Sequence, residues 1–130
     1  MRQLAAFVLV SLAMQMIATM DDVKGLDVQA HSDGSQYMVT VTADKEYEGD
    51  QAIVTIYYHV PTPPGLYPQD GENHELLIHK TESAELLPGV TIGVAGVHVG
   101  ADKVKWFDVT IVKPVQKARF DTAAAKLTWY

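Results

Sequence analysis

The sequence contains no cysteine among its 130 residues. This absence excludes disulfide bonds, thiol nucleophiles, thiolate zinc sites and iron–sulfur clusters. It also excludes a lipid anchor on an N-terminal cysteine. Basic residues are few as well, because 10 lysines and arginines stand against 16 acidic residues and the net charge is −6. An acidic chain is repelled by a phosphate backbone, so we expect no nucleic-acid partner.

Recognisable catalytic motifs are also missing. No serine stands in a G-x-S-x-G setting, and no glycine-rich loop has the spacing that holds a phosphate or a dinucleotide. The acidic pairs lie near the N-terminus or in expected loops, where carboxylates are usually solvated. The sequence therefore predicts a protein that is not an enzyme.

An apolar N-terminus has the layout of a secretory signal. Arg2 supplies the positive charge, Leu4 to Met14 is apolar except for Ser11, and the next charged residues are acidic. The run is too short to span a bilayer comfortably. We predict a hydrophobic helix over residues 1–20 and export to the periplasm, the cell surface or the exterior. Three fates stay open: removal, retention as an anchor and packing in an assembly. Membrane contact is expected only through this segment, if it is retained.

Residues 21–130 are expected to form one domain built from strands. Beyond residue 30, apolar residues alternate with polar ones and Gly-, Pro- and Asp-rich turns separate the runs. In the run 89–99, a bulge at Ala95-Gly96 would keep the valines on one face. The segment 120–127 could form one or two helical turns, capped by Asp121 or Thr122. The expected strands are 36–44, 51–60, 75–81, 89–99, 104–113 and 125–130.

Short strands with frequent turns predict an immunoglobulin-like or fibronectin-like antiparallel β-sandwich. The segment ELLPGVTIGV, residues 85–94, resembles the turn before the penultimate strands of fibronectin type III modules. The tyrosine expected near that corner is missing. We therefore predict a fold class and no family.

Three of the five histidines lie in or beside the stretch from Tyr57 to His79. Histidine with carboxylate suits copper or zinc. The candidate metal ligands are His59, His74 and His79, with Asp70, Glu72 or Glu75 nearby. Strand parity puts His59 and His79 on outward faces, but no H-x-H pair fixes a site. The alternative is inert surface histidines around a loop, which we favour, and we expect no cofactor.

The connection at residues 61–73 is rich in proline and has an aromatic residue at its middle. A stiff backbone that exposes an aromatic side chain suits recognition. The candidate partner-binding residues here are Pro63, Pro64, Leu66 and Tyr67. A strap that covers the end of the sandwich is the equal alternative. Trp129 and Tyr130 end a segment that could pair with a neighbour's sheet, although an ordinary last strand is simpler.

Three functions follow as hypotheses. The first is a non-catalytic exported module that binds proteins or assembles with itself, with a subunit of an extracellular filament or surface complex as its sharpest form. The second is a small periplasmic or secreted copper- or zinc-binding protein. The third is an accessory domain that binds carbohydrate through Tyr57, Tyr67 or Trp106.

Overall fold

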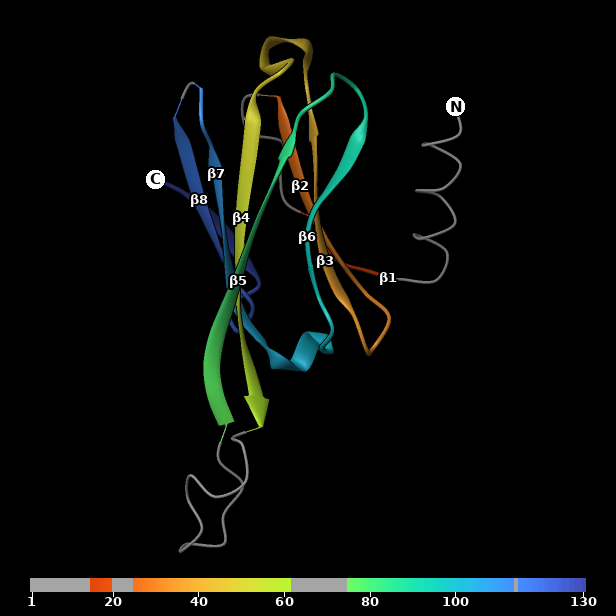
Figure 1. The fold of residues 1–130 in the computed structure, drawn as a ribbon, viewed down its shortest axis with the longest axis vertical. Helices are drawn as coiled ribbons and strands as arrows, with labels where there is room; N and C mark the ends of the chain where they lie inside the picture. The colour runs from red at the N-terminus through yellow and green to blue at the C-terminus, as the bar shows by residue number, and fades with distance from the viewer. Residues whose placement is uncertain (1–14, 20–24, 62–74, 114) are drawn as a thin grey trace, which may run out of the picture.

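The computed structural model describes residues 15–19, 25–61, 75–113 and 115–130, with the backbone alone for 15–19. The described residues form nine β-strands and two short 3₁₀ turns, and they contain no α-helix (Figure 1). None of them lies in a helix long and apolar enough to cross a membrane. The prediction of an all-β protein is confirmed.

The strands form two antiparallel sheets that pack face to face as a sandwich. The chain passes from the first sheet to the second after β3, returns after β5 and passes again after β6. In spatial order, the first sheet consists of β1 (Gln15–Thr19), β2 (Leu26–Ser32), β3 (Tyr37–Ala43) and β6 (Thr91–Val97). The second consists of β5 (Glu75–Glu85), β4 (Gln51–Pro61), β7 (Val104–Ile111), β8 (Gln116–Asp121) and β9 (Lys126–Trp129).

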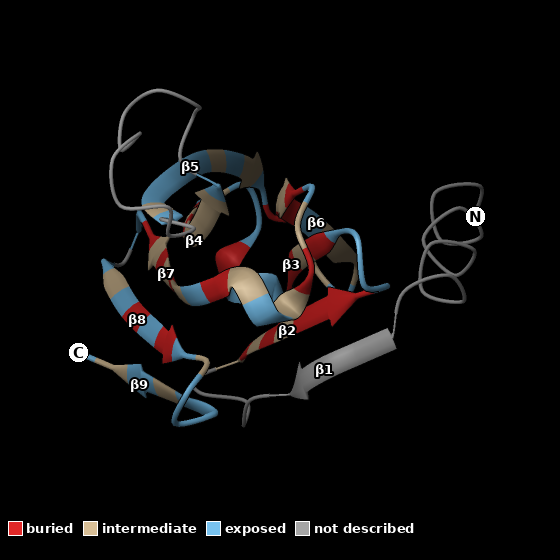
Figure 2. Cartoon of the chain, turned by 90° about the horizontal axis from the view of Figure 1, so that it is seen from below, coloured by how far each residue is buried: buried red, intermediate tan, exposed pale blue. Residues whose placement is uncertain are grey.

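The core lies between the sheets because alternate side chains of the central strands point inward. Val39 and Val41 from β3 and Val54 and Ile56 from β4 are fully buried members of one core. A fully buried aliphatic side chain contributes about 1.5–3 kcal/mol relative to an exposed one. In Figure 2 the buried residues gather on the strands that enclose the core, whereas most residues of β5 are exposed.

A bulge in β6 keeps consecutive core residues inward. Val39 pairs with Ala95 while Thr40 pairs with Gly93, so Val94 is the extra residue. Both Val94 and Ala95 are buried. The predicted bulge is therefore present, one residue earlier than expected.

Two predictions about local structure need correction. Residues 15–19 pair with β2 as strand β1 instead of ending a helix, and residues 1–14 lie outside the described residues. The segment 120–127 contains the end of β8, a turn and the start of β9. Asp121 does cap this turn, because its carboxylate accepts the backbone N–H groups of Ala123 and Ala124 at 2.9 and 3.3 Å. The strand pairing across the turn takes the place of the predicted helical turns.

Candidate functional site

The β4–β5 hairpin extends beyond the rest of the sandwich (Figure 1). Its strands pair along their whole length, from Gln51 opposite Glu85 to Pro61 opposite Glu75. The pairing of β4 with β7 ends earlier, where Tyr58 lies opposite Val104. The last residues of β4 are therefore held in the sheet by β5 alone. This hairpin carries most of the described residues that the sequence singled out.

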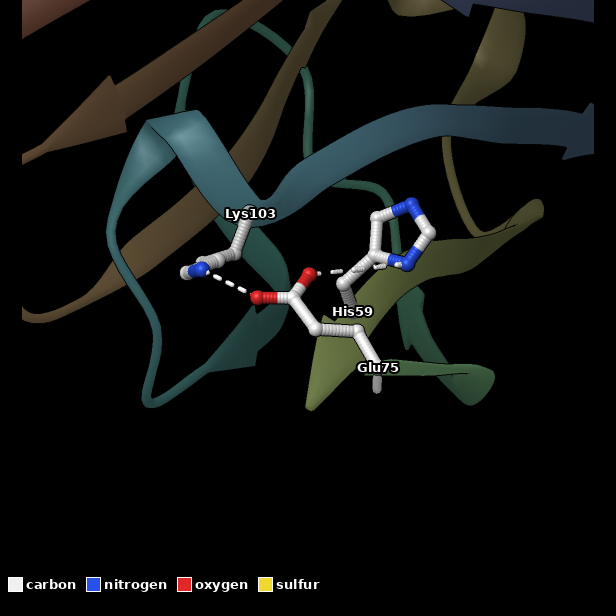
Figure 3. Close-up of polar contacts among 3 residues, drawn as sticks. All are labelled: His59, Glu75 and Lys103. Atoms are coloured by element: carbon white, nitrogen blue, oxygen red, sulfur yellow. Dashed lines mark hydrogen bonds and ion pairs between the residues drawn. The ribbon is translucent and has the colours of Figure 1, made fainter. Parts of the chain in front are cut away.

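A polar cluster ties the hairpin to the body of the sandwich (Figure 3). Lys103, from the 3₁₀ turn η2 (Ala101–Lys103), donates a hydrogen bond to Glu75 Oε1 at 2.5 Å. The other oxygen of Glu75 lies 3.9 Å from His59 Nδ1. The hydrogen bond and the charge of Lys103 lower the pKa of Glu75, and Glu75 in turn raises the pKa of Lys103. The ion pair between Lys103 and Glu75 neutralises both charges, which suits a tether between hairpin and body, and His59 Nδ1 is buried beside it without a hydrogen-bond partner among the described residues.

A stack of rings crosses the outer face of the second sheet. His79 of β5 lies 5.5 Å from Tyr57 of β4, and Tyr57 lies 4.8 Å from Trp106 of β7, measured between ring centroids. The guanidinium of Arg119 in β8 lies 5.0 Å from the Trp106 centroid and donates two hydrogen bonds to Asp108. Tyr57 and Trp106 each have neighbours on both sides. The stack braces four strands of the second sheet. The carbohydrate hypothesis stays a prediction, and Tyr67 lies outside the described residues.

The structure places two of the candidate metal ligands at diagonal positions of the β4–β5 pair. His59 and His79 share the outer face of the second sheet, but His79 packs on Tyr57 while His59 lies beside Glu75. Within the described ranges, no three His, Asp or Glu side chains are placed to hold a metal ion. His74 lies outside those ranges. The metal hypothesis stays a prediction, which stoichiometric copper or zinc uptake and its loss in His59→Ala would test.

Some of the candidate partner-binding residues lie within the described ranges and some lie outside them. Pro63, Pro64, Leu66 and Tyr67 lie outside the described residues. Trp129 packs against the core from β9, and Tyr130 is exposed. Tyr130 borders an open groove of about 500 Å³ along β8 and β9, together with Arg119 and Lys126.

Sequence reasoning missed the exposed edge of β5. Leu77 is 45% exposed and Ile78 36%, which is unusual for large apolar residues in a strand of this protein. Among the described residues, β5 pairs only with β4, so its other edge has no strand partner. The run ELLIH was itself a signal, because an apolar strand at a sheet edge needs a cover or a charge.

The two halves of this edge differ. In the second half, Lys80 donates to the carbonyl of Gly96 in β6 at 3.1 Å and pairs with Glu82 at 2.7 Å. Inward charges of this kind prevent another strand from pairing. In the first half, residues 75–79, the one charged residue is Glu75 at its start, which pairs with Lys103, and the residues at its centre are apolar. We call residues 75–79 of β5 the open edge.

Comparison with known proteins adds no relative: no family model, no curated protein and no solved structure matches this chain.

Proposed function

We propose that this protein is a non-catalytic exported module that binds other proteins or assembles with itself through the open edge of β5. One observation carries the proposal: exposed Leu77 and Ile78 lie on an unpaired strand edge, in a hairpin that extends beyond the sandwich. Unpaired backbone groups at such an edge can pair with an added strand, and exposed apolar side chains then supply contact area. The ion pair between Glu75 and Lys103 favours a structural role for these two groups over a catalytic one.

The order of the strands supports an immunoglobulin-like or fibronectin-like arrangement. If β2 to β8 are taken as strands A to G, one sheet holds A, B and E and the other holds C, F and G together with the fourth strand. The constant-type immunoglobulin sandwich differs in placing its fourth strand on the first sheet. On this assignment β1 and β9 are additions at the outer edges. Sandwiches of this kind are common in cell-surface and extracellular recognition.

The proposal of export is based on the apolar N-terminus. It is tested on protein isolated from the cells that naturally produce it. Fractionation should place the chain outside the cytoplasm, and its intact mass should report whether the N-terminal segment is retained. Recovery of the full chain only from the cytoplasm would contradict export.

The binding surface is tested by placing a photoreactive amino acid at position 77 and expressing the protein in its native source. Illumination should link position 77 to a protein. The matched control is the same amino acid at Ser83, which is exposed on the same face of β5 but lies in its charge-protected half. No adduct at position 77, or equal adducts at both positions, would contradict the proposal.

A further inference from the structure

We propose that the open edge of β5 binds the open edge of a second copy of this chain, antiparallel and about a two-fold axis at Leu77. The inference rests on the proposed function, because it names the partner of the same surface. It joins the two five-stranded sheets, edge to edge, into one sheet that runs through both copies.

Symmetry restricts the possible registers. A two-fold axis that makes two edge strands antiparallel is perpendicular to the sheet, so each face of one copy continues into the same face of the other. Side chains alternate between faces along a strand, so residues on one face can oppose only residues of the same parity. The axis must therefore pass through a residue position, and only a few positions lie within the open edge.

An axis at Leu77 is the register that matches side chains by chemistry. Leu77 then opposes its own copy, Leu76 opposes Ile78, and Glu75 opposes His79. Apolar residues face apolar residues at the centre of the paired segment, and Glu75, whose carboxylate already binds Lys103, lies opposite His79 at its ends. Opposed pairs of these kinds stabilise antiparallel strands. The exposed side chains of Leu77 and Ile78 become covered in this arrangement.

Neighbouring registers are worse. An axis at Ile78 would oppose Leu77 with His79 and Leu76 with Lys80. An axis at Leu76 would oppose Glu75 with Leu77. Each of these places a polar or charged group against an apolar one, which forfeits the apolar contact.

The protected half of β5 limits the paired segment. Lys80 is held by the Gly96 carbonyl and by Glu82, so pairing beyond His79 would have to break these contacts. A segment of five residues buries less area than a standard stable interface, so the dimer is expected to be weak and concentration-dependent. An isologous contact also closes on itself, so growth beyond a dimer would need another surface.

The absence of cysteine allows a direct test. In the proposed dimer the two Leu77 Cβ atoms lie about 4.5–5.5 Å apart, close to disulfide geometry. The Leu77→Cys variant should therefore form a disulfide-linked dimer at least ~10-fold faster under mild oxidation than Ser83→Cys, its control on the same face of β5; a factor of ten corresponds to about 1.4 kcal/mol. Equal rates would overturn the inference.

The register is tested in the Leu77→Cys background. His79→Glu places carboxylate opposite carboxylate and should slow linkage several-fold, whereas His79→Lys places an ammonium opposite the carboxylate and should not. Equal rates in the two variants would overturn the register. Circular dichroism should show that each variant keeps the wild-type strand signal.

The mass of the photochemical adduct at position 77 separates this inference from the proposed function. An adduct of twice the chain mass supports both. An adduct with a different protein and none with the chain itself overturns the second copy as partner but sustains the binding function. No adduct overturns both.

Discussion

His31 is a buried histidine on the outer face of the first sheet. Only 6% of the residue is exposed, and its Nε2 lies 3.3 Å from the hydroxyl of Thr40, which is also buried. Burial lowers the pKa of His31 below its ordinary value of 6.5. The folded protein therefore holds this imidazole neutral where the unfolded chain would already begin to bind a proton.

This histidine should make folding stability depend on pH. Its folded pKa is depressed, so its contribution to stability is fully present above about pH 6.5 and is lost as the pH falls below that value. Urea unfolding at pH 7.5 and pH 5.5 should show a larger loss for the wild type than for His31→Gln. The exposed His98 supplies the control, and His98→Gln should behave as the wild type. An unchanged loss in His31→Gln would contradict the assignment.

At the scale of single elements, a bulge in β7 decides which residues reach the core. Tyr57 pairs with Trp106 while Tyr58 pairs with Val104, so Lys105 is the extra residue. Val104 and Phe107 are three positions apart and are nevertheless both buried. Thr122 holds the bulge from the end of β8. Its hydroxyl lies 2.7 Å from the carbonyl oxygen of Val104 and 2.6 Å from that of Lys105 and donates its single proton to this pair, and its backbone N–H donates to the carbonyl of Lys105 at 3.1 Å.

Removing this hydroxyl should destabilise the fold. Thr122→Val keeps the shape but deletes the donor, and we expect a loss of about 0.5–1.5 kcal/mol in the free energy of unfolding. Thr122→Ser keeps the hydroxyl and should lose clearly less. Chemical denaturation of both variants measures the difference. Equal losses would mean that the methyl group, and not the hydrogen bond, holds the bulge.

Across the whole molecule, the same kinds of apolar residue have two different roles. Phe107 is fully buried, lies 6.4 Å from Tyr37 of the other sheet between ring centroids, and so connects the two layers. Leu77 lies outside this core and is half exposed. Core residues contribute to folding, and we assign the open edge to binding.

Truncation should separate the two roles. Phe107→Ala should cost about 3–5 kcal/mol through lost burial and a cavity. Leu77→Ala should change stability by no more than about 0.5 kcal/mol, as is usual at exposed positions. Thermal and denaturant unfolding of the two variants measures this contrast. A large loss from Leu77→Ala would place this residue in the core and contradict an open edge.

Much of the fold was predictable because strand alternation is local. Val54 and Ile56 reveal an inward face without knowledge of any neighbour, since side chains two apart lie on one side of a strand. The same parity places His59 and His79 on the outer face. It also predicts a bulge in β6, because the valines change phase within one run. The strand β2 could also be predicted from the sequence, because the apolar residues Leu26, Val28 and Ala30 stand at alternate positions. In β8 only Ala118 and Phe120 follow this pattern, which is too short to predict a strand.

The sequence alone determined that the chain forms strands, where most of them lie and which side of each faces inward, because these properties depend on residues a few positions apart. Only the tertiary structure decided which strands are neighbours and which are edges. That choice places Glu75 beside Lys103, stacks Trp106 between Tyr57 and Arg119, and leaves Leu77 exposed. The apolar run ELLIH would predict a strand equally well in the middle of a sheet and at its edge. Its exposure results from the absence of a second strand beside β5 among the described residues, which is a property of long-range pairing.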